Sequence, residues 1–232
     1  RSLNHKYDTI FIAKLGSNGE PRLWHPTDTN KDNWDYWYET ADDPTMALPD
    51  ERINGNAVAY NNKMYFVGGI DNSSATGAVT NTVWVADILP NGKLGTFSAS
   101  TSLSSGGPGA RFGHTLLVYN DYLYVVGGSG TVSGSPSNSV YYIKINSNGT
   151  LSSSWQQTTS FATGRINIGG KNAVVWGAYV YLTGGCGAVN ASGYCTSPLG
   201  DTQIASINAD GPLGTWETLS GVTNTRFGFG ML

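Results

Sequence analysis

The sequence predicts an all-β fold built from a repeated unit of four short strands. One order of strands and turns recurs three times, glycine supplies 31 of the 232 residues, and only 12% of residues are charged. Abundant glycine with few charges is typical of short strands joined by tight turns. A chain of this length can bury a core. We therefore expect residues 1–232 to form one repeat domain or part of one.

The repeated unit is clearest between Arg111 and Trp155. It begins with an arginine and two adjacent apolar strands, and two glycines end the second strand. A third strand, an Asn-Gly turn and a fourth segment bearing an aromatic residue complete it. The parts are, in order, Arg111, the strands 115–119 and 122–126, Gly127-Gly128, the strand 140–145, Asn148-Gly149 and Trp155. Asn-Gly strongly predicts a two-residue hairpin, because both turn positions need positive φ.

The same order of parts recurs on both sides of this unit. The upstream copy contains Arg52, the strands 57–60 and 64–67, Gly68-Gly69, the strand 83–88, Asn91-Gly92 and Phe97. The downstream copy contains Arg165, the strands 173–176 and 179–183, Gly184-Gly185, the strand 204–207, Asp210-Gly211 and Trp216. Repeats of about 50 residues with four strands each indicate a propeller or a similar array. The second strands are almost continuously apolar, so we expect neighbouring units to cover both of their faces.

Partial units flank the three complete ones. Near the N-terminus, Ile10 to Leu15 fits a third strand, and Trp37 to Thr40 fits its fourth strand better than Leu23-Trp24 does. Near the C-terminus, Arg226 to Leu232 matches the start of a first strand. We expect three complete units and a split, incomplete fourth, as in a fragment of a larger propeller. The expected pieces are 1–50, 51–110, 111–164, 165–225 and 226–232.

The repeated parts resemble kelch repeats of the bacterial surface-protein type. The shared features are the diglycine after an apolar strand, the aromatic residue before the next repeat and the arginine that opens each first strand. The motif Asn/Asp-Gly-x-Leu-Gly-x-Trp is present at Asp210 to Trp216, and the resemblance covers nearly the whole chain outside residues 21–50. It implies a β-propeller of four-stranded antiparallel blades around a central channel. It specifies fold rather than function, because kelch propellers include both binding scaffolds and enzymes.

Histidines and cysteines argue against a metal centre. The bacterial pattern places a histidine shortly after the arginine, as at His114. The comparable places in the other repeats hold Asn56, Gly169 and Phe229. The other two histidines, His5 and His25, are scattered, and both cysteines lie in one loop. We therefore expect neither a metal site nor a cofactor.

Two sets of residues are candidates for ligand binding. Residues 21–34 form an insertion, and the segment 24–38, which overlaps it, concentrates the aromatic residues Trp24, Trp34, Tyr36, Trp37 and Tyr38. Exposed aromatic rings stack on sugars and mark interfaces, although these rings could instead cover an outer sheet edge. The second set contains the once-per-repeat arginines, Arg52, Arg111, Arg165 and Arg226. They could bind a carboxylate at the channel mouth, or each could bond backbone carbonyls of its own or an adjacent blade.

The cysteines suggest an oxidising compartment. Cys186 and Cys195 lie nine positions apart in a polar loop, and the chain has no other cysteine. We expect a disulfide that stabilises the fold by about 2.5 to 3 kcal/mol on the chain-entropy estimate, with two free thiols as the alternative. Asn72, Asn148 and Asn190 begin glycosylation sequons. These features favour an extracellular or cell-surface location.

Composition and motifs narrow the functional classes. The net charge of −3 without a basic stripe disfavours nucleic acid, and no apolar run approaches the roughly 20 residues of a membrane span. Paired carboxylates, a nucleophile with a base and a phosphate loop do not stand out. We expect a non-enzymatic binding or adhesion module whose loops hold a protein or glycan ligand, with further blades or neighbouring subunits as other partners. The alternatives are a carbohydrate- or sialic-acid-active enzyme at an arginine-lined channel mouth and a structural surface-layer or filament subunit.

Overall fold

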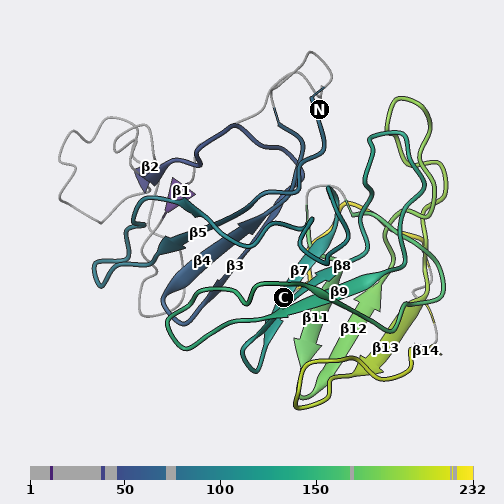
Figure 1. Cartoon of the computed structure of the whole chain (residues 1–232). Coiled ribbons are helices and arrows are strands. Elements are labelled where there is room, and N and C mark those ends of the chain that lie inside the picture. Colours follow the sequence, from purple (N-terminus) through teal and green to yellow (C-terminus); the bar gives the residue numbers. More distant parts are fainter. Residues whose placement is uncertain are drawn as a thin grey trace.

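The computed structural model describes residues 11–12, 38–39, 46–71, 77–167, 170–219, 221 and 224–231. These residues form three four-stranded antiparallel sheets and one two-stranded sheet, and they include no α-helix (Figure 1). In each larger sheet, consecutive strands are hydrogen-bonded neighbours. The predicted all-β fold with three four-stranded antiparallel blades is therefore confirmed.

The strands follow the predicted repeats closely. Blade 1 contains β3 (Asn56–Tyr60), β4 (Lys63–Val67), β5 (Val83–Asp87) and β6 (Ser98–Ala99). Blade 2 contains β7 (Thr115–Tyr119), β8 (Tyr122–Val126), β9 (Val140–Lys144) and β10 (Gln156–Thr158). Blade 3 contains β11 (Ala173–Trp176), β12 (Tyr179–Thr183), β13 (Thr202–Ser206) and β14 (Glu217–Leu219).

The two-stranded sheet belongs to the partial unit that precedes blade 1. It pairs β1 (Phe11–Ile12) with β2 (Tyr38–Glu39), and Ile12 lies opposite Tyr38. β1 thus occupies the third-strand position of the partial repeat, and its partner β2 begins directly after Trp37. This pairing confirms the predicted fourth strand. The alternative at Leu23-Trp24 lies outside the described residues.

The first strands lie together at the inner side of the blades. β7 contacts β3 on one side and β11 on the other, and the remaining strands of each sheet extend outward from them (Figure 1). This arrangement matches blades that radiate from an axis. Residues 227–231 form no strand in the described structure, and Phe11–Ile12 pairs there with Tyr38–Glu39.

The apolar core consists of layers between successive blades, and β8 shows why. Successive side chains of a strand point to opposite faces of its sheet. Leu123 and Val125 pack in the layer shared with blade 1, whereas Tyr124 and Val126 pack in the layer shared with blade 3. A strand covered on both faces needs apolar residues at every position. This explains the continuous apolar run seen in the sequence.

One backbone hydrogen bond joins each blade to the arginine that follows it. The second glycine of each pair donates its N–H to that arginine's carbonyl oxygen: Gly69 to Arg111 at 2.8 Å, Gly128 to Arg165 at 2.9 Å and Gly185 to Arg226 at 2.8 Å. The first glycine allows this approach. A Cβ atom on Gly127 would lie 2.7 Å from the Arg165 oxygen, and φ at Gly127 is +67°. The diglycines are therefore required by blade contact as well as by backbone conformation.

A side-chain hydrogen bond repeats in the same layers. The Tyr65 hydroxyl of blade 1 donates to the carbonyl oxygen of Gly149 in blade 2, and the Tyr124 hydroxyl donates to Gly211 in blade 3, both at 2.8 Å. Both tyrosines are fully buried. Burial, and then the nearby Tyr60, raise the pKa of Tyr65 to about 12. The Asx-Gly turns of blades 2 and 3 thus each supply a carbonyl that satisfies a buried hydroxyl of the preceding blade.

We predict that Gly127→Ala costs about 3 to 4 kcal/mol of unfolding free energy, because backbone strain adds to a clash with the next blade. Gly109→Ala is the matched control, since Gly109 has φ of +72° but open space around a Cβ position, and it should cost only about 1 kcal/mol. Urea unfolding followed by tryptophan fluorescence measures both. Equal losses would show that the contact with Arg165 contributes nothing.

Candidate functional site

A pocket lies where the first strands of the three blades begin. Its volume is about 410 Å³. The described residues that line it are Asn54, Gly55, Asn56, Ala57, Phe66, His114, Asn167, Gly170 and Lys171. Since it opens beside the adjacent starts of β3, β7 and β11, we call it the axial pocket. All three blades therefore contribute to one site.

Strand register shows that Gly55, His114 and Lys171 occupy equivalent positions. Asn56 pairs with Val67 and Thr115 pairs with Val126, each just before a diglycine. In blade 3 the Thr183 N–H donates to the Asn172 carbonyl at the matching place. The residue before each of these first-strand positions is therefore glycine in blade 1, histidine in blade 2 and lysine in blade 3.

This register corrects the alignment drawn from the sequence alone. The sequence placed Asn56 and Gly169 at positions comparable to His114. Asn172 follows its arginine by seven positions, whereas Asn56 and Thr115 follow theirs by four. The three additional residues in blade 3 shift Lys171, rather than Gly169, to the position of His114.

Backbone and amide hydrogen bonds between blades hold the rim of the axial pocket. The Gly113 N–H donates to the Asn54 carbonyl at 2.9 Å, and the Asn167 N–H donates to the Gly113 carbonyl at 2.8 Å. The Asn167 side chain then accepts from the Gly228 N–H at 2.7 Å and donates to the Phe229 carbonyl at 2.8 Å. Asn54, Gly113, Asn167 and Gly228 each lie two residues after an arginine. The rim is thus built from one repeat position and is fixed from blade to blade.

His114 is a buried, neutral imidazole in the pocket lining. Its exposed fraction is 1%, and neither Nδ1 nor Nε2 has a hydrogen-bond partner among the described residues. Burial, and then the charge of Arg111, lower the pKa of His114 to about 3. Both effects disfavour a second positive charge at this point. The ring therefore stays uncharged near neutral pH.

Lys171 brings a positive charge to the same pocket. Its side chain is half-buried, and burial lowers its pKa. Lys171 makes no salt bridge within the described part of the chain. Its carbonyl oxygen accepts a hydrogen bond from the Met231 N–H at 2.8 Å, which ties this position to the C-terminal segment.

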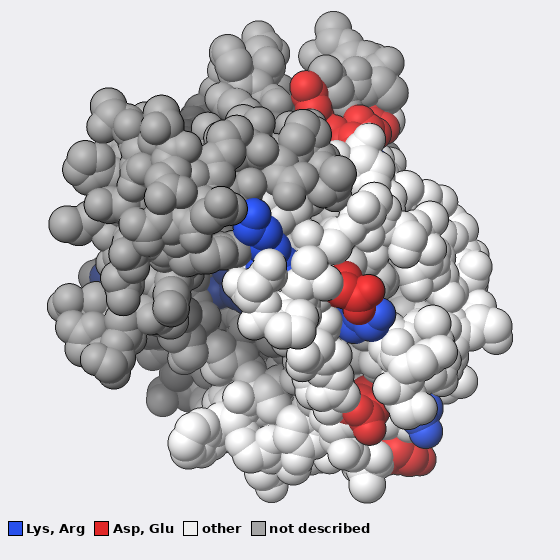
Figure 2. Space-filling view, turned by 90° about the vertical axis from the view of Figure 1, so that its left-hand side faces the viewer, with Lys and Arg blue, Asp and Glu red and all other residues white. Residues whose placement is uncertain are grey.

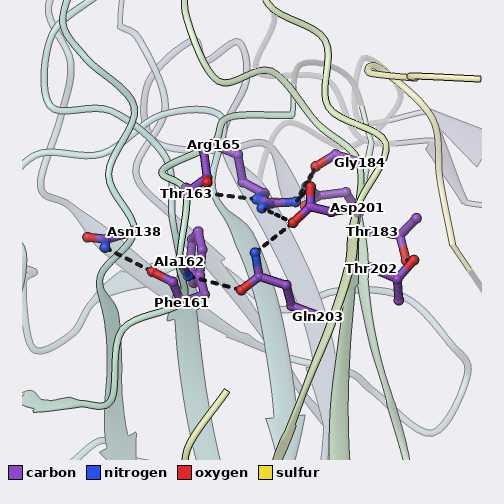
Figure 3. Close-up of polar contacts among 11 residues, drawn as sticks. Asn138, Phe161, Ala162, Thr163, Arg165, Thr183, Gly184, Asp201, Thr202 and Gln203 are labelled. Atoms are coloured by element: carbon purple, nitrogen blue, oxygen red, sulfur yellow. Dashed lines mark hydrogen bonds and ion pairs between the residues drawn. The ribbon is translucent and has the colours of Figure 1, made fainter. Parts of the chain in front are cut away.

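Arg165 is occupied by contacts inside blade 3. Its guanidinium forms a two-point ion pair with Asp201 at 3.1 and 2.8 Å and donates to the carbonyls of Gly184 and Thr163 (Figure 3). Burial acts to raise the pKa of Asp201, but hydrogen bonds from Arg165 and Gln203 hold it below its ordinary value. This set is an internal brace, as the architectural alternative predicted.

The other three arginines differ in their partners. Arg52 pairs with Asp50 at 2.7 Å and stacks over the Trp84 ring at 4.4 Å. Arg111 has no acidic partner among the described residues, and its buried Nε has no hydrogen-bond partner. Arg226 is exposed. The described lining of the axial pocket includes none of the four arginines.

The missing carboxylate beside Arg111 has a visible cause in the repeat. Asp201 pairs with Arg165 just before the third strand of blade 3 (Figure 3). The corresponding residue of blade 2 is Ser139, because the Gly184 N–H donates to the Asp201 carbonyl and the Gly127 N–H donates to the Ser139 carbonyl. Arg111 retains only a long contact of 3.5 Å with Ser139. Blade 2 therefore carries an uncompensated guanidinium near His114.

Charge is otherwise sparse and scattered. Figure 2 shows one face on which the described surface is mostly neither acidic nor basic, with Lys, Arg, Asp and Glu spread singly or in small groups. The chain as a whole has a net charge of −3. Lys171 and Arg111 lack carboxylate partners among the described residues. This excess of positive charge near the axial pocket is therefore local and does not follow from the overall charge of the chain.

The remaining predicted site residues have different outcomes. Trp24, Trp34, Tyr36 and Trp37 lie outside the described residues, so a binding role for the aromatic segment stays a prediction. Tyr38 belongs to β2, and the structure describes its strand pairing only. Sequence reasoning did not single out Lys171. The sequence feature that could have identified Lys171 is the longer spacing between Arg165 and the first strand of blade 3.

The predicted disulfide between Cys186 and Cys195 is present. Cys186 is fully buried and packs with Ile70, Phe112 and Ile166 in a small apolar cluster. These residues come from the three blades near the diglycine end of the second strands. The disulfide thus closes a loop whose base packs beside the starts of the first strands.

We predict that His114 makes the fold sensitive to mild acid. The unfolded chain binds a proton at His114 below pH about 6.5, whereas the folded chain does so only near pH 3. Stability should therefore fall with decreasing pH across this window, by about 1.4 kcal/mol per unit. Urea unfolding at pH 7.0 and 5.0 should show a loss about 2 kcal/mol larger for the native protein than for His114→Leu. Identical pH dependence in the two proteins would contradict the assigned state of His114.

Comparisons with known proteins agree with the architecture. A family model described as the Kelch motif matches residues 110–148, which contain β7 to β9 and the following turn. No curated protein matches the chain. A solved structure titled "Structure of YjhT" is similar with a TM-score of 0.59 and 16% identity, over 96% of this chain and 65% of that chain. The chain thus spans slightly less than two thirds of YjhT, and the likeness concerns fold alone. The motif and this likeness together support a kelch-repeat β-propeller.

Proposed function

We propose that the chain is a non-enzymatic binding module that holds a polar ligand in the axial pocket, outside the cell or at its surface. The observation that carries this proposal is the half-buried Lys171 ammonium, which lacks a salt-bridge partner among the described residues and lines a pocket of about 410 Å³. Burying a charge without a partner is unfavourable. A bound polar group would offset that cost, so the pocket is better suited to a ligand than to packing alone.

The lining provides groups that recognise polar ligands. Asn54 and Asn56 carry amides that can donate and accept hydrogen bonds, whereas both ends of the Asn167 amide already bond within the rim. Phe66 adds an aromatic ring to the same lining. Pockets of a few hundred Å³ with a small number of fixed polar groups are typical ligand sites. The rim that holds these residues is braced between blades, so the site is preformed.

The chemistry of the pocket favours binding over catalysis. A general base works best when its pKa lies near the working pH, and the pKa of His114 is about 3. The described lining contains no carboxylate that could share proton transfer with it. The alternative of a carbohydrate-active enzyme would need acid and base groups supplied by other residues.

The proposed location rests on the disulfide. Cys186–Cys195 is the kind of bond that persists in oxidising compartments. The described residues contain no helix long and apolar enough to cross a membrane. An adhesive role at the cell surface is part of the proposal and would place the ligand on another cell or on a matrix.

We predict that filling the axial pocket abolishes ligand binding. Ala57 lines the pocket on β3, whereas Ala59 is an exposed residue of the same strand that is absent from the described lining. Ala57→Trp should weaken binding at least tenfold to any oligosaccharide or peptide that the native protein captures on glycan and peptide arrays. Ala59→Trp should leave binding unchanged, and circular dichroism should show that both variants are folded.

The proposal fails if the native protein captures nothing on either array. It also fails if Ala57→Trp binds as well as the native protein, since the ligand would then lie elsewhere. A turnover of captured oligosaccharides would contradict the non-enzymatic part of the proposal.

A further inference from the structure

Positive charge exceeds negative charge around the axial pocket, and a comparison of equivalent arginines in the three blades shows where the excess arises. Two of the three arginines that open a complete blade have carboxylate partners, Asp50 for Arg52 and Asp201 for Arg165. Arg111, the third, has none among the described residues, and Lys171 likewise has none. Burial lowers the pKa of both Arg111 and Lys171. Within the described part of the chain, two partly desolvated cations are therefore without acidic partners, although the net charge of the whole sequence is negative.

These two cations act on the same place. Arg111 lies close enough to His114 to disfavour its protonation, and His114 and Lys171 both line the axial pocket. Because strand register makes His114 and Lys171 equivalent, they project from neighbouring inner strands at one level of the blades. Charge effects are strong where water is partly excluded. The potential in the pocket is therefore positive at the side formed by blades 2 and 3.

The uncharged part of the lining indicates what else the ligand carries. Asn56 lines the pocket and donates one amide hydrogen to the His114 carbonyl at 3.2 Å, which leaves its second amide hydrogen and its side-chain oxygen for a ligand. Asn54 has φ of +55° and places a second amide at the rim. Amides beside an aromatic ring such as Phe66 suit hydroxyl groups on a compact ring.

We infer that the axial pocket binds an acidic sugar, with its carboxylate held by Lys171 in the field of Arg111 and its hydroxyls held by the asparagine amides. This inference rests on the proposed function and specifies the ligand class for the same pocket. The carboxylate supplies a counter-charge to Lys171, which lines the pocket and has no salt-bridge partner among the described residues. Neutral sugars lack that charge, and inorganic anions lack the hydroxyls.

The probe for this inference is D-glucuronate, with D-glucose and sulfate as comparison ligands. Binding is measured by ¹H–¹⁵N NMR titration at constant ionic strength, following the amides of Gly55, His114 and Lys171. We expect saturable shifts with glucuronate, at least tenfold weaker binding of glucose, and at least tenfold weaker binding of sulfate. Raising the salt concentration should weaken glucuronate binding, because the charge interaction is screened.

Lys171→Gln should weaken glucuronate binding at least tenfold. Lys144→Gln is the matched control, since Lys144 is an exposed residue of β9 outside the described lining, and it should bind like the native protein. Unchanged dispersion of the amide spectrum shows that each variant is folded. Equal glucuronate affinity in the native protein and Lys171→Gln would overturn the inference, as would glucose or sulfate binding as tightly as glucuronate.

The two proposals fail in different ways. If Ala57→Trp removes array ligands that are neutral and Lys171→Gln does not affect them, the pocket binds ligands but the acidic-sugar inference is wrong. If N-acetyl-aspartate binds more tightly than glucuronate, the carboxylate belongs to a peptide, which also overturns the inference. If the arrays yield nothing while glucuronate binds through Lys171, adhesion fails and the assignment of the site stands.

Discussion

The hydrogen bond between the second glycine of one blade and the arginine carbonyl of the next determines how the blades meet. It occurs at Gly69, Gly128 and Gly185 with nearly equal lengths. A close approach of two backbones excludes any side chain at the preceding glycine, which explains why the diglycine recurs. The same approach brings the first strands together, so that turn carbonyls of blades 2 and 3 reach the buried tyrosines of the preceding blades.

The candidate site follows from this constraint. Equivalent positions meet at the axis, and small differences among repeats are therefore concentrated there. Gly55, His114 and Lys171 share one position, and Ser139 stands where blade 3 has Asp201. The scaffold tolerates these changes because the backbone bonds that hold the rim are unaffected by them. An uncompensated positive charge can thus form inside a regular array without disturbing blade contact.

The strands, the fourth strand after Trp37 and the disulfide were all predicted from the sequence, because local signals encode each of them. The same is true of the structural role of the diglycines at the ends of the second strands. Turn residues and apolar runs define strand ends, and two cysteines in one loop have one possible partner each. The axial pocket was not predicted. Equivalence between His114 and Lys171 depends on strand register, which the three additional residues before β11 conceal in a linear alignment. The roles of Arg111 and Arg165 also differ because they meet Ser139 and Asp201 respectively, and each of these partners is distant from its arginine in the sequence.

The central claim is that the diglycine contact holds successive blades together, and native-state hydrogen exchange tests it most directly. The account predicts that the amides of Gly69, Gly128 and Gly185 exchange as slowly as that of Val125 in the buried strand β8, because opening them requires the blades to separate. The amide of Gly177, in an exposed hairpin turn, should exchange much faster. Exchange of the three diglycine amides at the rate of Gly177, with Val125 still protected, would contradict the account.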